Sequence, residues 1–102
     1  MIDNLNYITY RELCRTEGIE SEYVIAIVEY GIVTPKNQAP IEEWVFEANS
    51  VYWIKKALRL RQDLEIDWVA VSMVIELLRQ KDTLEKENLR INRLLQRFIE
   101  GD

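Results

Sequence analysis

The C-terminal third of the chain constrains the fold most, because it contains neither glycine nor proline between Trp68 and Ile99. Asp67 is a suitable N-cap for a helix that begins at Trp68. The apolar residues that follow are spaced for one face of a helix: Val71, Val74, Ile75 and Leu78. The segment from Lys81 to Ile99 is predicted to continue this helix, or else to form a fifth helix after a kink near Asp82.

A seven-residue periodicity runs through the same stretch. One register holds Leu77, Leu84, Ile91 and Phe98, and the complementary register holds Val74, Lys81, Asn88 and Leu95. The registers correspond to the d and a positions of heptads, and an Asn at a central a position fixes the register at a cost in stability. The seam is short for a coiled coil. A homodimer helix and a helix folded back on its own domain therefore both remain open.

Helix length slightly favours pairing. A helix from Asp82 to Ile99 would be ~27 Å long at ~1.5 Å per residue, which is long for a small domain to cover alone. We therefore predict dimerisation through one set of side chains: Leu84, Asn88, Ile91, Leu95 and Phe98. The predicted division is a domain over residues 1–80 and a C-terminal helix over residues 81–102, which pairs or packs on that same domain.

The N-terminal half predicts two short helices close together. Thr9 and Glu12 form the Thr-x-x-Glu pattern of a capping box, and Gly18 ends the first helix. The second helix covers about residues 21–30, and Gly31 stands where a left-handed C-terminal cap is expected. Only a few residues join the two helices, which is the spacing of a helix-turn-helix.

A winged fold follows from the middle of the chain. β-Branched and aromatic residues at 32–34 and 44–46 flank a loop bounded by Pro35 and Pro40, which predicts two short strands of a hairpin with a wide tip. A third helix is predicted over residues 50–64. The predicted fold class is mainly α: a winged helix-turn-helix with a short β-hairpin wing and a long C-terminal helix.

Composition excludes most catalytic chemistry. The chain has no histidine, and Cys14 is its one cysteine, so a Cys/His zinc site and a Ser–His or Cys–His catalytic pair are excluded. Its three glycines form no phosphate-binding loop. We therefore predict no enzymatic activity, no metal and no cofactor, with Cys14 as a small core side chain. No apolar run approaches the ~20 residues that span a bilayer, and no signal segment is evident, which predicts a cytoplasmic protein without membrane contact.

The charge of the chain is divided unevenly. The formal net charge is −5, and residues 1–50 carry three basic and nine acidic side chains, whereas residues 51–102 carry ten basic and nine acidic ones. The acidic excess therefore lies on the helix-turn-helix and the wing. A DNA-binding protein needs the opposite, because Lys and Arg neutralise the phosphates. DNA binding is therefore not expected.

The helix over residues 21–30 contains no Lys, Arg, Asn or Gln, the side chains best suited to reading base edges. It suits a protein partner better, and the candidate contacts are Glu22, Ile25, Ala26 and Glu29. The glutamates could equally be ordinary exposed residues, and Ile25 a further core residue. A second candidate surface is the acidic turn after the third helix: Asp63, Glu65 and Asp67.

The third helix is basic. Its cationic side chains are Lys55, Lys56, Arg59 and Arg61. They could contact phosphates, or they could form a solvated helix face, which is the commoner role of such charges.

The order of these elements resembles the MerR-type winged-helix regulators. The family pattern across the recognition helix aligns without a gap from Gly18 to Val33. The core positions agree at Gly18, Ile19, Val24, Ile27, Gly31, Ile32 and Val33. Ile25 and Ala26 stand where that family has a DNA-contacting Arg and Tyr.

Nearly the whole chain is similar to the CbpM chaperone-modulator family. The resembling stretches are residues 12–14, 18–19, 31–33 with Pro35, 44–46, 57–68 and the tail from Glu87 to Phe98. The resemblance implies an inhibitor of the J-domain cochaperone CbpA, which binds the J-domain, competes with the Hsp70 chaperone DnaK and suppresses DNA binding by CbpA. It also implies a basic target, because J-domains present a basic second helix to Hsp70, and an acidic half-molecule would complement it.

Three hypotheses follow. The leading one is a protein-binding regulator that masks the Hsp70-facing surface of a J-domain and performs no chemistry. The alternative is a MerR-like DNA-binding transcriptional regulator that would work through Lys36, Lys55, Lys56 and Arg59. A third is a structural adaptor that pairs through its C-terminal helix.

Overall fold

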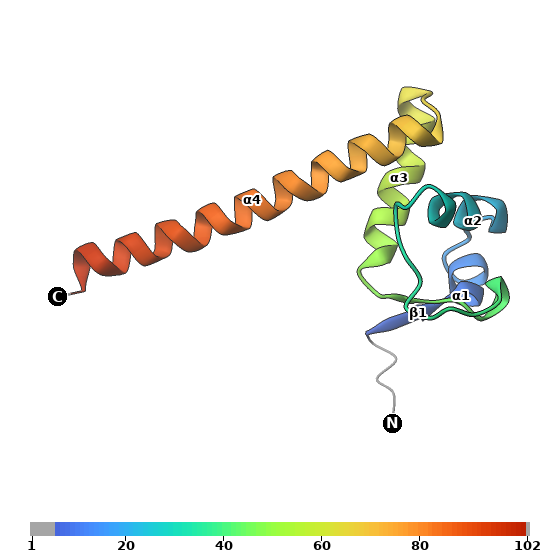
Figure 1. Cartoon of the computed structure of the whole chain (residues 1–102), viewed down its shortest axis with the longest axis horizontal. Helices are drawn as coiled ribbons and strands as arrows, with labels where there is room; N and C mark the ends of the chain where they lie inside the picture. Colours follow the sequence, from blue (N-terminus) through green and yellow to red (C-terminus); the bar gives the residue numbers. More distant parts are fainter. Residues whose placement is uncertain (1–5, 102) are drawn as a thin grey trace.

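The computed structural model describes residues 6–101 and consists of a small helical body from which one long helix projects (Figure 1). Two strands and a single turn of 3-10 helix, η1, complete the body. In chain order the elements are β1 (Tyr7–Thr9), α1 (Tyr10–Arg15), α2 (Ser21–Glu29), η1 (Ile41–Glu43), β2 (Val45–Glu47), α3 (Ser50–Leu64) and α4 (Trp68–Glu100). The predicted fold class, mainly α with a two-stranded unit and a long C-terminal helix, is confirmed.

Local signals set the helix ends as the sequence predicted. The Thr9 N–H donates to Glu12 Oε1 at 2.9 Å and the Glu12 N–H donates to Thr9 Oγ1 at 3.1 Å, which closes the capping box. Gly18 and Gly31 have φ values of 71° and 73° after α1 and α2, a region that glycine adopts without steric cost. At the start of α4, Asp67 Oδ1 accepts from the Ala70 N–H at 2.9 Å.

The predicted hairpin was wrong in its first strand. Residues 32–34 form no strand, and β2 pairs antiparallel with β1 instead, with Ile8 opposite Phe46. The loop before β2 nevertheless lies beside this strand, since the Lys36 N–H donates to the Val45 carbonyl at 2.7 Å. The Asn37 side chain fixes this turn by donating to the Glu43 carbonyl at 2.9 Å and accepting from the Val45 N–H at 3.0 Å. Strand β1 thus ties the N-terminal segment to the wing.

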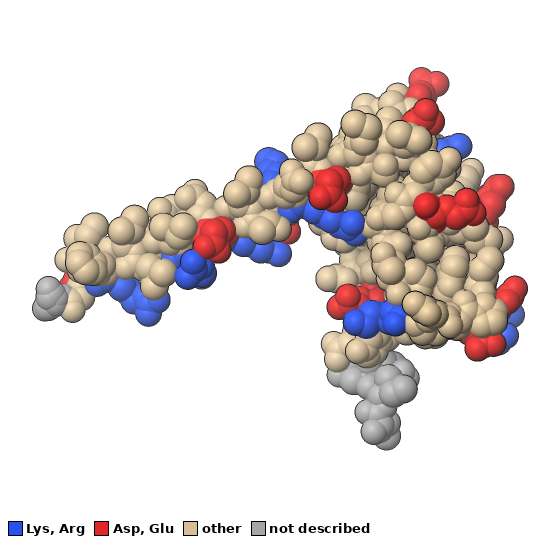
Figure 2. Space-filling view, viewed as in Figure 1, with Lys and Arg blue, Asp and Glu red and all other residues tan. Residues whose placement is uncertain are grey.

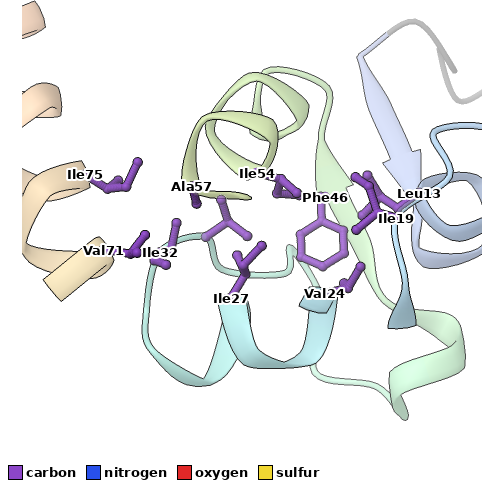
Figure 3. Close-up of a cluster of buried hydrophobic side chains, with 11 residues drawn as sticks. Leu13, Ile19, Val24, Ile27, Ile32, Phe46, Ile54, Ala57, Val71 and Ile75 are labelled. Carbon is purple, nitrogen blue, oxygen red and sulfur yellow. The ribbon is translucent and has the colours of Figure 1, made fainter. Parts of the chain in front are cut away.

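One apolar core joins every helix of the body. Phe46 of β2 is fully buried, and its ring lies between α2 and α3 with Val24 and Ile54 beside it (Figure 3). The other buried apolar residues are Leu13, Ile19, Ile27, Ile32, Val33, Ala57, Val71 and Ile75. Cys14 is only half-buried at the edge of this core. The core therefore fixes α2 against α3 and presents the opposite side of α2 to solvent.

Helix α4 is continuous over 33 residues, so the alternative of a kink near Asp82 with a fifth helix was wrong. Val71 and Ile75 bury its first turns against the body, whereas every residue from Lys81 to Gly101 is exposed. The alternative of a helix folded back on its own domain was also wrong, since this segment extends away from the body (Figure 1). We call residues 81–100 the α4 arm.

Candidate functional site

The first candidate surface lies on the solvent side of α2. Glu22 and Glu29 are exposed and about two helical turns apart, and Ile25 and Ala26 between them are half-buried. We call these four residues the α2 acidic face. Ile25 therefore falls between the two roles considered for it, because it is half-buried but does not belong to the buried core. A half-exposed aliphatic residue flanked by carboxylates is suited to a partner with a basic rim and an apolar centre.

Neighbouring elements extend the negative charge around this face. Glu42 and Glu43 of η1 are exposed, and η1 packs against α1. Tyr10 of α1 reaches both neighbours, since its hydroxyl bonds the Ser21 side chain at the start of α2 and lies near the Glu42 carboxylate. Burial raises the pKa of Tyr10 above its ordinary value, although the hydrogen bond with Ser21 acts in the opposite direction. Acidic side chains project from several parts of the body in Figure 2.

The second candidate surface is the turn between α3 and α4. Asp63, Glu65 and Asp67 are all exposed there. The Asp67 carboxylate also caps α4, so its orientation is set by the helix. Glu65 has a left-handed backbone, with φ of 52°. The structure thus places Asp63 in the last turn of α3, and Glu65 and Asp67 in the connection that follows, where Asp67 already caps α4.

Lys55 and Lys56 of α3 have separate local partners within the body. Lys55 Nζ lies 2.6 Å from Glu17 Oε1, and Lys56 Nζ lies 5.7 Å from the centre of the Tyr52 ring. Arg59 is exposed. Lys36 is exposed as well, but it stands on the loop before β2 rather than on α3. Two of the four side chains proposed for DNA are therefore already engaged within the body.

Sequence reasoning missed a cation–aromatic cluster around Arg61. Its guanidinium carbon lies 5.6 Å from the centre of the Tyr23 ring and 4.9 Å from that of Trp68, so it joins α2, α3 and α4. The one available signal was that Arg61 shares a helix face with Ile54 and lies seven residues before Trp68. A second such pair places Arg79 of α4 over the Trp53 ring, at 4.9 Å.

The α4 arm carries the predicted dimerisation residues, which we call the α4 seam: Leu84, Asn88, Ile91, Leu95 and Phe98. All five are exposed, and Phe98 retains 84% of its accessible surface. Basic residues lie on the opposite side of the arm: Lys86, Arg90, Arg93 and Arg97. Contiguous exposed apolar surface of this kind marks interaction sites in soluble proteins.

Chemical sites were sought within residues 6–101. In that range no group of three or more His, Cys, Asp or Glu side chains is placed to hold a metal ion. None of the helices described there is long and apolar enough to cross a membrane. What the described residues do offer are the α2 acidic face, the acidic α3–α4 turn and the α4 seam.

Comparison with known proteins agrees with this arrangement. Residues 8–93 match the family model described as MerR HTH family regulatory protein. A protein named "Chaperone modulatory protein CbpM" from Pseudomonas entomophila (strain L48) is 39% identical over 88% of both chains. Proteins of the same name from Citrobacter koseri and Escherichia coli O139:H28 are 35% and 32% identical over 89% of both chains. These relatives are named as modulatory proteins rather than as enzymes.

Proposed function

Because the chain belongs to the CbpM family of chaperone modulatory proteins, on a MerR-type helix-turn-helix scaffold, we propose that it inhibits a CbpA-type J-domain cochaperone by masking its Hsp70-facing surface. The coarser role, modulation of a chaperone system, follows from the family. The masking of a J-domain in the cytoplasm, and the residues that do it, are what we propose.

The α2 acidic face carries this proposal. On this helix-turn-helix scaffold, the solvent side of α2 holds Glu22 and Glu29 and no cationic side chain. A basic helix of a J-domain would meet two carboxylates and, between them, the half-buried Ile25 and Ala26. Complementary charge accelerates the encounter and selects the partner, whereas desolvated apolar contacts hold the complex. The acidic turn of Asp63, Glu65 and Asp67 is a second contact for the same partner.

Charge reversal tests this surface. We expect the double variant Glu22→Lys and Glu29→Lys to bind the J-domain of the CbpA encoded in the same genome at least about fivefold more weakly at ~50 mM salt, with a smaller difference at ~500 mM. Affinity is measured by calorimetry. The matched control is Glu76→Lys with Glu100→Lys, which changes the net charge equally on α4 and leaves affinity unchanged. Equal affinity of wild type and the α2 variant at low salt would overturn the assignment of this surface.

The inhibitor is proposed to act as a homodimer through the α4 seam. The seam is too apolar to remain in water along several turns, and nothing within residues 6–101 covers it. Sedimentation of the wild type should give a dimer, and Ile91→Asp with Leu95→Asp should give a monomer whose circular dichroism still reports a folded body. A wild type that sediments as a monomer at all concentrations removes this part of the proposal.

DNA binding is the second candidate function, favoured by the match to a family of helix-turn-helix regulators. It would depend on Lys36, Lys55, Lys56 and Arg59. Lys55 is bonded to Glu17, and α2 lacks the side chains that read bases, so this candidate has less support. A mobility-shift measurement at ~50 mM salt decides it, because phosphate binding by these cations would be strongest there. Absence of any shift would remove the candidate.

A further inference from the structure

A groove of about 700 Å³ runs between the turn that joins α1 to α2 and the flank of α3. None of its lining residues belongs to either acidic surface proposed above. Its apolar lining comes from Ile19, Tyr23 and Leu58, of which Ile19 is buried and the other two are half-buried. Its charged lining includes Arg59 and Arg61 of α3. The groove thus combines an apolar floor with cations, which is the composition of a site for an amphipathic ligand.

Arg61 lies against two aromatic rings. The Tyr23 and Trp68 rings hold its guanidinium at centroid distances of 5.6 Å and 4.9 Å. No carboxylate within residues 6–101 forms an ion pair with it, and its buried Nε has no hydrogen-bond partner there. Aromatic contacts stabilise the charge but do not use the N–H groups, which lie in the plane of the guanidinium. Because Nε is enclosed, a ligand would pair with the two Nη groups, and a planar carboxylate matches such a pair of donors.

The remaining charges leave the groove positive. Lys55 is neutralised by Glu17 at 2.6 Å, so neither dominates the local field. Arg59 is exposed and has no ion pair among the residues described, while Glu20 is the acidic residue left in the lining. Glu20 also begins α2 without a side-chain cap, so the positive end of this nine-residue helix borders the groove. The net charge of the groove is therefore positive, because Arg59, Arg61 and the positive end of α2 exceed the single negative charge of Glu20.

We propose that this groove binds the side-chain carboxylate of an acidic peptide segment in a protein partner, held by Arg61 and Arg59. The apolar floor takes an aliphatic side chain next to that carboxylate, which distinguishes a peptide from a free organic acid. The site is independent of the α2 acidic face, because it uses α3 cations and recognises the opposite charge.

The test uses the full-length chain labelled with nitrogen-15. The probes are acetyl-Leu-Glu-Leu-amide, the matched acetyl-Leu-Gln-Leu-amide, and glutarate. We expect the glutamate peptide to shift the Trp68 indole N–H and the Arg61 Nε–H resonances saturably, and to bind at least about tenfold more tightly than the glutamine peptide or glutarate. Equal binding of both peptides, or glutarate binding as tightly as the glutamate peptide, would overturn the proposal.

Substitutions distinguish peptide binding in this groove from non-specific ionic attraction to the rest of the chain. Arg59→Gln should weaken binding of the glutamate peptide about fivefold. Arg61→Lys should weaken it by more, because lysine keeps the charge but lacks the planar set of N–H donors. Arg93→Gln on the α4 arm is the matched control and should leave the affinity unchanged. If Arg61→Lys fails to fold, Arg59→Gln still decides the matter, since that side chain is exposed. An equal loss of affinity in Arg59→Gln and Arg93→Gln would overturn the assignment.

Discussion

Apolar side chains recur along both ends of α4, and yet only those of its first turns are covered by the body. Val71 and Ile75 are 0% and 1% exposed against the body, whereas Leu84 and Phe98 on the α4 arm are 68% and 84% exposed. The exposed apolar face begins before the arm, with Met73, which is 64% exposed. Met73 lies two residues after the buried Val71, which corresponds to about 200° of helix rotation, so the two side chains point to different sides of α4. Periodicity therefore identified two apolar faces, and tertiary structure alone shows which of them the body buries.

The largest difference between the regions should appear on truncating a phenylalanine in each. Phe46→Ala removes a ring that is fully buried, and we expect it to lower the free energy of unfolding by about 3–5 kcal/mol. Phe98→Ala removes an exposed ring and should change only the part of stability that depends on protein concentration, through dimer formation. Urea unfolding at two concentrations measures both. Equal losses in the two variants at low concentration would contradict the division into body and arm.

Much of the fold could be predicted because its signals are local. Thr9, Asp67 and Gly31 act within one turn of a helix end, and the structure places each cap as predicted. The partner of β2 could not be predicted, because strands about 35 residues apart pair through tertiary contacts that no neighbouring residue encodes. The capping box at Thr9 predicts only the start of a helix, so nothing in the local pattern predicts a strand over Tyr7–Thr9.

The candidate site was predictable only in part. That Glu22 and Glu29 are exposed follows from helix periodicity, once Val24 and Ile27 are assigned to the core. The Arg61 cluster could not be found in this way, because its two rings come from different helices. Which partner each surface meets is set by shape and charge outside this chain, and so stays a prediction.

Removing a helix cap should lower the free energy of unfolding by an intermediate amount, and only where the cap belongs to the body. Asp67→Ala removes the acceptor for the Ala70 N–H at the start of α4, and we expect a loss of about 1 kcal/mol in stability. Asp82→Ala is the matched control on the arm, where the carboxylate only pairs with Lys86 on an exposed surface, and should cost less than about 0.5 kcal/mol. Urea unfolding distinguishes them. A larger loss for Asp82→Ala would mean that the arm, rather than the docked end, governs unfolding.

Removing the arm should have a still smaller effect on the body. A chain ending at Gln80 keeps Val71 and Ile75, and with them every buried contact that α4 makes. We therefore expect the unfolding free energy of the monomer to change by less than about 0.5 kcal/mol, as for other surface changes. The measurement is the urea midpoint, with sedimentation to follow the loss of the dimer. A body that unfolds on truncation would contradict the predicted boundary at residue 80.

The smallest effect concerns an ion pair on the arm. The Arg90 guanidinium, with Nη2 2.6 Å from Glu87 Oε1, holds the pKa of that carboxyl below its ordinary value, through hydrogen bonding first and charge second. A lowered pKa in the folded state stabilises it above the ordinary value of 4.5, and that contribution is lost as the pH falls through the lowered value. We expect Arg90→Gln to return the Glu87 titration, followed by NMR, toward 4.5 without a measurable change in unfolding at pH 7. The same Glu87 titration in wild type and variant would show that the pair does not form in solution, and that the arm is ordered by its seam alone.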